Sequence, residues 1–145
     1  MHTADRPVRF LLAEDDADHA DLVMRALRKS DVSNEFAHVR DGEEALAYLR
    51  RQPPHENVSR PDVIVLDLKM PRMDGHELLE VIKVDPDLAM IPVVVLTTSK
   101  SEADRARAYG SHANSYLVKP LDFQRFHEMI SQLGVYWSVW NEPPV

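Results

Sequence analysis

Four apolar residues in a row, Val63 to Leu66, run directly into the carboxylate of Asp67. A short unbroken apolar run is typical of a strand that is buried on both faces of a parallel sheet. Met70 and Pro71 end any regular structure soon afterwards, so Asp67 would lie at the C-terminal edge of the sheet. Open α/β sheets bind their ligands at this edge. An aspartate after an apolar run is weak evidence on its own, so the interpretation depends on which other residues reach the same edge.

The composition is that of an ordinary folded protein. A length of 145 residues suits a single domain, and 44% hydrophobic with 28% charged residues predicts a globular core. The chain has no cysteine, which excludes disulfides and thiolate metal sites. With a formal net charge of −7 and no run of Lys or Arg, direct nucleic-acid binding is not expected. Apolar runs of only four or five residues and no signal-peptide core predict a cytoplasmic protein that spans no membrane.

Five segments that predict strands alternate with five that predict helices. The predicted strands cover residues 9–13, 35–40, 63–66, 91–96 and 115–118, and helical spacing predicts helices that begin near Asp18, Glu43, His76, Glu102 and Asp122. Short connections and right-handed crossovers then predict one doubly wound α/β domain, with helices on both faces of a five-stranded parallel sheet. Residues 35–40 alternate polar and apolar side chains, which suits an edge strand and predicts the strand order 2-1-3-4-5.

Several polar residues follow the predicted strands directly. Because parallel strands point the same way, these residues should meet at one edge of the sheet. They are Glu14, Asp15 and Asp16 after the first strand, Asp67 and the Lys69 backbone after the third, Thr97 and Thr98 after the fourth, and Lys119 after the fifth. A carboxylate cluster without His or Cys favours a hard cation with oxygen ligands, and a few carboxylates with water suit Mg²⁺.

The same edge offers partners for a phosphoryl group. Lys119 supplies a fixed positive charge, and Thr97 supplies a hydroxyl donor. Together with Mg²⁺, these groups can hold a phosphoryl group by its oxygens. In that setting Asp67 can act as a nucleophile and become an acyl phosphate.

Each of these residues also has a purely structural explanation. Asp15 or Asp16 could cap the first helix, Thr97 could be a strand-end hydroxyl, and Lys119 could be a solvated surface lysine. The functional interpretation is favoured because, if every residue were only structural, four separate strand ends would have to resemble one site by chance.

The histidines show no metal-ligand spacing. There are seven of them, and we expect His19, His76 and His127 to be surface residues. A histidine-based phosphotransfer domain is therefore not supported.

Four segments of the chain resemble the receiver domains of bacterial two-component response regulators. They are LLAEDD at 11–16, VIVLDLKMPRMDG at 63–75, PVVVLTTS at 92–99 and SYLVKP at 115–120. The resemblance covers about residues 8–134 and implies a flavodoxin-like fold. We expect a single receiver domain over residues 1–145, with residues 135–145 as an aromatic C-terminal tail.

The resemblance implies a role for most residues of the edge. Asp67 would accept a phosphoryl group from a partner histidine kinase, in a transfer that the receiver itself catalyses. Asp15, Asp67 and the Lys69 carbonyl would bind Mg²⁺ directly, and Glu14 would act on it mainly through water. Thr97 would bind the phosphoryl oxygens.

Further residues match the family's charge, switch and lifetime positions. Lys119 would pair with the phosphoryl oxygens, and the bond from Lys119 to Pro120 is usually cis in the family. Tyr116 matches the switch aromatic, which moves inward as Thr97 moves toward the phosphoryl group. Lys69 and Ser99 occupy the two positions that tune the lifetime of the phosphoryl group.

The C-terminal tail carries an aromatic cluster of Tyr136, Trp137 and Trp140. Exposed clustered aromatics usually mark an interface, which predicts a homodimer through the fourth helix, the last strand, the last helix and the tail. The alternative is that the tail folds back on its own domain. The long loop 51–61, the last strand and these aromatics also resemble stand-alone response regulators that partner phytochrome-like kinases, among them bacteriophytochromes.

Two other functions stay open from the sequence. One is a Mg²⁺-dependent phosphohydrolase with an aspartyl nucleophile. Such enzymes typically carry a second Asp two residues after the first, and this chain has Lys69 there. The other is a constitutive interaction module. The presence of the acidic cluster, Thr97 and Lys119 argues against this alternative.

Overall fold

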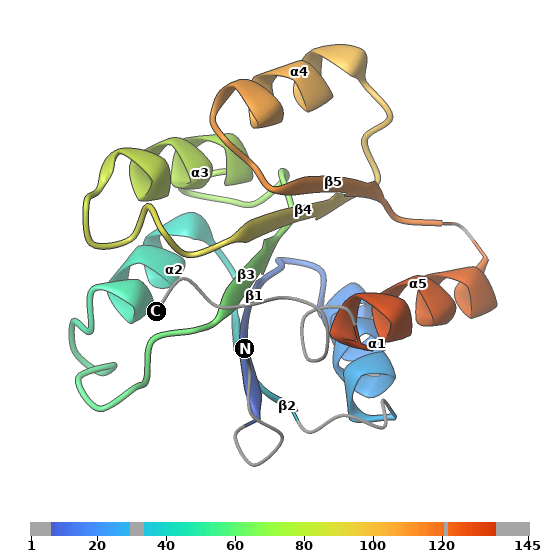
Figure 1. Ribbon diagram of the computed structural model, residues 1–145, viewed down its shortest axis with the longest axis horizontal. Coiled ribbons are helices and arrows are strands. Elements are labelled where there is room, and N and C mark those ends of the chain that lie inside the picture. Colours follow the sequence, from blue (N-terminus) through green and yellow to red (C-terminus); the bar gives the residue numbers. More distant parts are fainter. Residues whose placement is uncertain (1–6, 30–33, 121, 136–145) are drawn as a thin grey trace.

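Five strands alternate with five helices along the chain in the computed structural model, which describes residues 7–29, 34–120 and 122–135 (Figure 1). The strands are β1 (Val8–Ala13), β2 (Asn34–Val39), β3 (Val63–Leu66), β4 (Val93–Thr97) and β5 (Ser115–Val118). The helices are α1 (Ala17–Arg28), α2 (Gly42–Leu49), α3 (Gly75–Val84), α4 (Glu102–Gly110) and α5 (Phe123–Val135). Tyr136, Trp137 and Trp140, the predicted interface aromatics, lie outside the described residues.

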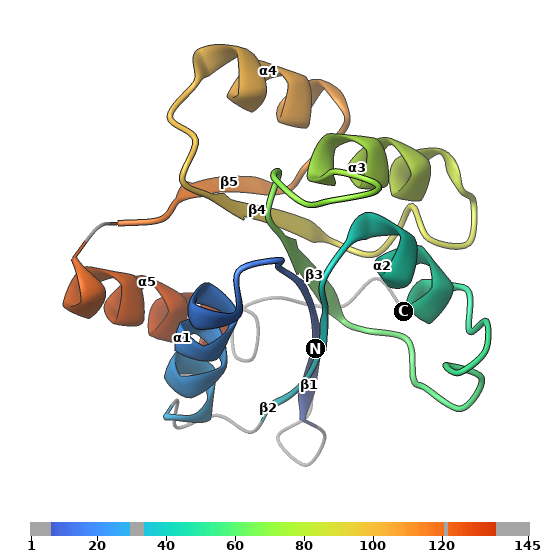
Figure 2. The same ribbon diagram turned by 180° about the vertical axis from the view of Figure 1, so that it is seen from behind.

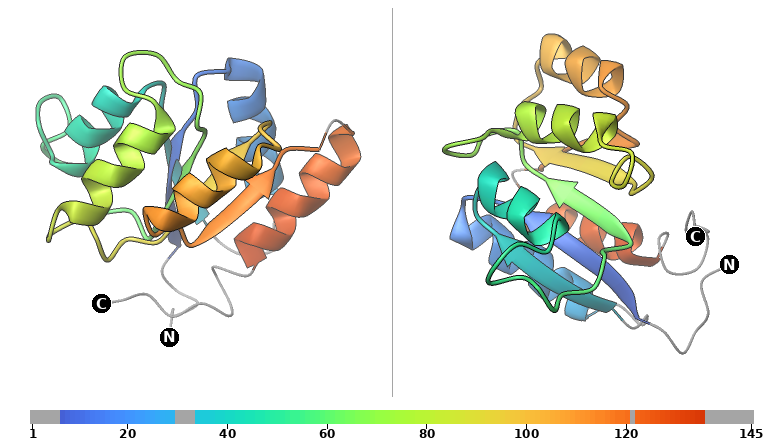
Figure 3. Two further views of the ribbon diagram at one scale, coloured as in Figure 1. Left: turned by 90° about the horizontal axis from the view of Figure 1, so that it is seen from above. Right: turned by 90° about the vertical axis from the view of Figure 1, so that its left-hand side faces the viewer.

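The strands form one parallel sheet in the order β2-β1-β3-β4-β5, which confirms the predicted topology. Helices α1 and α5 lie side by side on one face of the sheet, and α2, α3 and α4 cover the other (Figures 1 and 2). The views in Figure 3 show the sheet between these two helical layers. No helix within the described ranges is long and apolar enough to cross a membrane.

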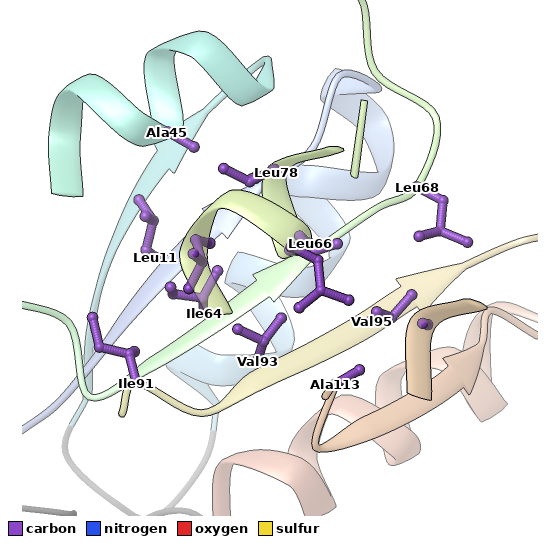
Figure 4. Close-up of a cluster of buried hydrophobic side chains, with 14 of the residues drawn as sticks. Leu11, Ala45, Ile64, Leu66, Leu68, Leu78, Ile91, Val93, Val95 and Ala113 are labelled. Atoms are coloured by element: carbon purple, nitrogen blue, oxygen red, sulfur yellow. The ribbon is translucent and has the colours of Figure 1, made fainter. Parts of the chain in front are cut away.

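Each face of the sheet carries its own apolar core because successive strand residues point to opposite sides. Phe10, Val65 and Leu96 pack under α1 and α5. Leu11 and Leu66 belong to the other cluster, beneath α2 and α3 (Figure 4). The strands β3 and β4 are apolar up to Thr97 and fully buried, as expected for central strands covered on both faces.

The first helix begins at Ala17, close to the predicted start near Asp18, and its cap is Asp16, one of the aspartates for which the sequence allowed this role. The Oδ1 atom of Asp16 accepts hydrogen bonds from the backbone N–H groups of Asp18 (2.9 Å) and His19 (3.2 Å), which is the geometry of an N-cap. The sequence could not separate two closely spaced aspartates, each able to cap. Asp16 is therefore committed to the start of α1.

The strand register brings the ends of β1, β3, β4 and β5 to the same edge of the sheet. Ala13 lies opposite Leu66, Leu66 lies opposite Val95, and Thr97 lies opposite Val118. The backbone N–H of Asp67 donates to the Ala13 carbonyl at 3.0 Å, which continues the pairing by one residue past the strand. The predicted site residues therefore leave the sheet at a common edge.

One peptide-bond prediction is wrong. Pro53–Pro54 is the one cis peptide bond within residues 7–29, 34–120 and 122–135, so the bond from Lys119 to Pro120 is trans. Nothing in the structure explains this difference from the expectation.

Candidate functional site

Lys119 and Asp67 meet at the C-terminal edge of the sheet. The Nζ atom of Lys119 lies 3.2 Å from the Oδ2 atom of Asp67, and their side chains are 2% and 11% exposed. Lys119 is held there by its own backbone, whose N–H donates to the Thr97 carbonyl at 2.7 Å. The sequence-predicted acceptor and its predicted positive partner are thus in direct contact.

Glu14 is the second carboxylate bound by Lys119. Its Oε1 atom accepts a hydrogen bond from Lys119 Nζ, and both side chains are 2% exposed. Burial raises the pKa of Glu14 to about 7, with the nearby charge of Asp67 acting in the same direction and the hydrogen bond from Lys119 opposing it. When both carboxylates are charged, two negative groups face one ammonium, and the net negative charge favours a further cation.

His19 also contacts Lys119, which the sequence did not predict. Its Nδ1 atom lies 2.9 Å from Lys119 Nζ, and its ring lies beside Phe126 of α5 with centroids 6.4 Å apart. His19 is partly exposed, at 34% of its side chain, so it lies at the surface as expected, but the sequence did not show its contact with Lys119. Its position on the inner side of α1 was the available signal, since Ala20 and Val23 nearby are buried.

The predicted Mg²⁺ ligands are not assembled as a set. Asp15 is exposed, whereas Glu14 and Asp67 both turn toward Lys119. Within the described residues, no three side chains of His, Cys, Asp or Glu gather closely enough to hold a metal ion. Their oxygen donors suit Mg²⁺, but the Lys119 ammonium occupies the place between the carboxylates that the cation would compete for.

Thr97 is fully buried at the end of β4. Its Oγ1 atom accepts a hydrogen bond from the backbone N–H of Ser99 at 3.2 Å. Thr98, next to it, is exposed. The Thr97 hydroxyl therefore links the end of β4 to the loop that follows it.

Ser99 joins this loop to α4. Its Oγ atom donates to Asp104 Oδ2 at 2.6 Å, and its carbonyl accepts from the Tyr116 hydroxyl at 3.1 Å. Tyr116 is 9% exposed, so its ring lies inward, with the Arg105 guanidinium 5.7 Å from the ring centroid. Tyr116 and Thr97, the predicted switch pair, are thus connected through Ser99.

His76 extends the same network to α3. Its Nε2 atom lies 3.1 Å from Asp104 Oδ1, and the residue is 6% exposed, so the predicted surface position is wrong. Its Nδ1 atom is buried without a hydrogen-bond partner in the part of the chain that the structure describes. The hydrogen bonds from Ser99 and His76 hold the pKa of Asp104 below its usual value. His127, on α5, is half-buried.

The loop after β3 packs tightly against the backbone of Asp67. A Cβ atom at Gly75 would lie 2.2 Å from the Asp67 carbonyl oxygen, so only glycine fits there. Farther along this edge, Arg72 Nε donates to Asp41 Oδ2 at 3.0 Å, and Asp41 caps α2. The loop that carries Lys69 is therefore held from both sides.

Known proteins share both the sequence pattern and this arrangement of strands and helices. The sequence matches the response regulator receiver domain family over residues 10–131. The chain belongs to this family. The order β2-β1-β3-β4-β5 with its two helical layers is the flavodoxin-like receiver fold that the sequence predicted.

Three proteins illustrate the similarity. The probable methanogenesis regulatory protein FilR2 of Methanothrix harundinacea is 45% identical over 143 residues, which cover 97% of this chain and 90% of that protein. The response regulator Rcp1 of Synechocystis sp. is 41% identical over 131 residues, or 90% of this chain and 89% of that protein. The crystal structure of the Mn²⁺-bound form of Rcp1 has a TM-score of 0.91 at 40% identity and covers 96% of this chain and 100% of that one.

The third is the phosphorylated cyanobacterial phytochrome response regulator RcpA. Its crystal structure has a TM-score of 0.92 at 39% identity, with 97% of this chain and 100% of that chain covered. This receiver is therefore related over nearly its whole length to response regulators of phytochrome type.

Proposed function

We propose that this receiver accepts a phosphoryl group on Asp67 from a partner histidine kinase and passes the signal on by a change of surface. The observation that carries the proposal is the contact of 3.2 Å between Lys119 Nζ and Asp67 Oδ2 at the C-terminal edge of the sheet. An ammonium at this distance orients one carboxylate oxygen and leaves the other, Oδ1, for attack on phosphorus. The same ammonium then pairs with a phosphoryl oxygen.

Metal binding is part of the proposal. Asp15, Asp67 and the Lys69 carbonyl would hold Mg²⁺, with Glu14 contributing mainly through water. Bound Mg²⁺ supplies positive charge against the phosphoryl oxygens. The Mn²⁺-bound form of Rcp1 supports a divalent cation in a related receiver. In this chain Lys119 must give up Glu14, which has a raised pKa of about 7, before that carboxylate can serve a cation.

The switch would run through Thr97 and the Ser99 loop. In this structure the Ser99 N–H donates to the Thr97 hydroxyl at 3.2 Å. When that hydroxyl turns to donate to a phosphoryl oxygen, its hydrogen bond with the Ser99 N–H is lost. The Ser99 carbonyl accepts a hydrogen bond from the Tyr116 hydroxyl, and the Ser99 side chain donates one to Asp104. Movement at Thr97 therefore reaches β5 and α4 together.

The partners follow from the relatives and from this face. A phytochrome-like histidine kinase is the proposed donor, since RcpA is a phytochrome response regulator. A homodimer through α4, β5, α5 and the tail aromatics is the proposed output, and Tyr109 on α4, 48% exposed, offers an aromatic contact there. Sedimentation before and after phosphorylation tests the dimer, and a monomer in both states would exclude it.

Treatment with acetyl phosphate and Mg²⁺ tests the function. We expect a gain in mass of one phosphoryl group, mapped to Asp67, that is absent without Mg²⁺ and absent in Asp67→Asn. Phosphotransfer from a panel of histidine kinases then identifies the donor. If neither acetyl phosphate nor any kinase modifies Asp67, that result supports the alternative of a constitutive interaction module. Multiple turnover of an external phosphoester would instead identify a phosphohydrolase.

A further inference from the structure

The Lys119 ammonium has a complete set of acceptors. It carries three N–H bonds and no lone pair. Three side chains face it: Glu14 through Oε1, Asp67 through Oδ2 at 3.2 Å, and His19 through Nδ1 at 2.9 Å. The Lys119 side chain is 2% exposed, so these three groups replace water as its hydrogen-bond partners. His19 is the one acceptor that neither the family resemblance nor the proposed function accounts for.

We propose that His19 is a positioning residue for the phosphoryl-acceptor site, because its Nδ1 atom holds the Lys119 ammonium beside Asp67. The hydrogen bond itself stands independently of what Asp67 does. Its effect on phosphorylation rests on the proposed function.

The contact determines the tautomer of His19. An ammonium can only donate, so Nδ1 must carry the lone pair and the ring proton must sit on Nε2. The Nδ1 atom also lies 3.7 Å from Asp16 Oδ2, a contact that would attract a protonated ring. The two contacts require opposite states of the same atom, and the shorter one, to Lys119, is within hydrogen-bond distance.

The surroundings of His19 keep its ring in place. From α1 it faces Asp16, whose Oδ1 atom is already bound to the Asp18 and His19 backbone N–H groups. From the end of β5 it faces Lys119, and from α5 it faces the uncharged ring of Phe126. Lys119 is therefore the hydrogen-bond donor toward which the lone pair of Nδ1 points.

His19 differs from the other two acceptors because phosphorylation does not change it chemically. Asp67 becomes an acyl phosphate, and Glu14 is a proposed partner of the metal site. Both therefore change their relation to Lys119 during the reaction. His19 is neutral and has no part in that chemistry, so it can keep the ammonium at the edge of the sheet throughout.

Nitrogen-15 spectroscopy of the unphosphorylated protein tests the contact directly. At neutral pH we expect His19 as the neutral tautomer with its proton on Nε2. We also expect the Lys119 Nζ resonance to shift in His19→Leu and not in His112→Asn, a control at an exposed histidine before β5. A proton on Nδ1, or an unchanged Lys119 resonance in His19→Leu, would overturn the proposal. Neither measurement depends on phosphorylation.

Rates of phosphorylation by acetyl phosphate test the consequence. Loss of one hydrogen bond to a charged group predicts a rate about tenfold lower in His19→Leu. His19→Asn carries an acceptor oxygen on Cγ, as Nδ1 is carried in histidine, and should restore most of the rate.

The outcomes separate the inference from the proposed function. If His19→Leu and His19→Asn are slowed equally while both fold normally by circular dichroism, His19 is only structural and the proposal fails. If the wild type itself is never phosphorylated, the proposed function fails, and the resonance measurements alone decide whether His19 positions Lys119.

Discussion

The Nζ atom of Lys119 lies 3.2 Å from the Oδ2 atom of Asp67, although 52 residues separate the two in the chain. The same ammonium binds Glu14, so one buried cation compensates two buried carboxylates. Charges in such surroundings are stable only while they are paired. The stability of the fold therefore depends on this pairing, at the same place where we propose that phosphorylation occurs.

Lys119→Met should lower the free energy of unfolding. The substitution leaves Glu14 and Asp67 buried without a cation, which costs about 3–5 kcal/mol in the free energy of unfolding. Urea denaturation at neutral pH measures it. Adding Glu14→Gln to Lys119→Met removes one uncompensated carboxylate and should recover part of the loss. If the double variant is no more stable than Lys119→Met, the loss has another source.

Gly75→Ala should displace the backbone that carries Asp67. The new Cβ would meet the Asp67 carbonyl oxygen at 2.2 Å and Leu68 Cα at 2.7 Å, and backbone atoms cannot rotate away. Overpacking of this kind costs about 1–3 kcal/mol in the free energy of unfolding, which urea denaturation measures.

Gly110→Ala is the matched control for that change. Gly110 lies within α4, and a Cβ atom added there would meet nothing within 4 Å. Alanine at this position should raise the free energy of unfolding by about 0.5–1 kcal/mol. Equal effects at Gly75 and Gly110 would show that contact with Asp67 is not what matters.

Asp104→Ala should loosen the loop after β4. It removes the acceptor of Ser99 Oγ (2.6 Å) and the partner of His76 Nε2 (3.1 Å), at a cost of about 1–3 kcal/mol. Amide exchange at Ser99 should become faster, because its side chain no longer fixes the loop.

Glu80→Ala provides the comparison for Asp104→Ala. Glu80 on α3 pairs with Arg107 on α4 at 3.1 Å, but both side chains are about half exposed. An exposed pair of this kind contributes at most about 1 kcal/mol. If Glu80→Ala destabilises the protein as much as Asp104→Ala, the partly buried hydrogen bonds of Asp104 contribute no more to stability than an exposed ion pair.

Asp41→Asn should reduce the sensitivity to acid. Burial acts to raise the pKa of Asp41, but hydrogen bonds from Arg72 and the Glu44 backbone outweigh it and hold the pKa below the usual 3.8. A depressed pKa contributes stability that is present above pH 3.8 and is lost as the pH falls through the folded-state pKa.

Asparagine keeps an acceptor oxygen for the Glu44 N–H at position 41, and it removes the charge together with the acceptor of the Arg72 hydrogen bonds. The free energy of unfolding of Asp41→Asn should therefore fall less steeply than that of the wild type below pH 3.8. Asp74→Asn, at the N-cap of α3, is the control. Parallel curves for Asp41→Asn and the wild type would contradict the expectation.

Lys69→Ala should shorten the lifetime of the phosphorylated state, if its exposed ammonium shields the acyl phosphate from water. The backbone N–H of Lys69 lies 3.5 Å from Asp67 Oδ1, which places the residue beside the acceptor. Loss of the phosphoryl group, followed by mass, should become faster. Lys29→Ala, at an exposed lysine after α1, controls for charge alone. An unchanged rate in Lys69→Ala would exclude the shielding.

The sequence by itself determined the sheet and the central contact of the site. The apolar runs of β3 and β4 required cover on both faces, and parallel strands necessarily deliver Asp67, Thr97 and Lys119 to one edge. These predictions succeeded because they depend on burial, which unbroken apolar runs show directly, and on strand direction, which is the same for all strands of a parallel sheet.

Only the tertiary structure decided which of several plausible partners each polar side chain takes. Asp16 caps α1, His19 binds Lys119 across 100 residues, and His76 lies buried against Asp104. Helical spacing shows that a histidine lies on a helix, but not which other element packs on that side of it. These contacts depend on how α1 meets the end of β5 and how α3 meets α4, and such distances are settled by the packing of the whole domain.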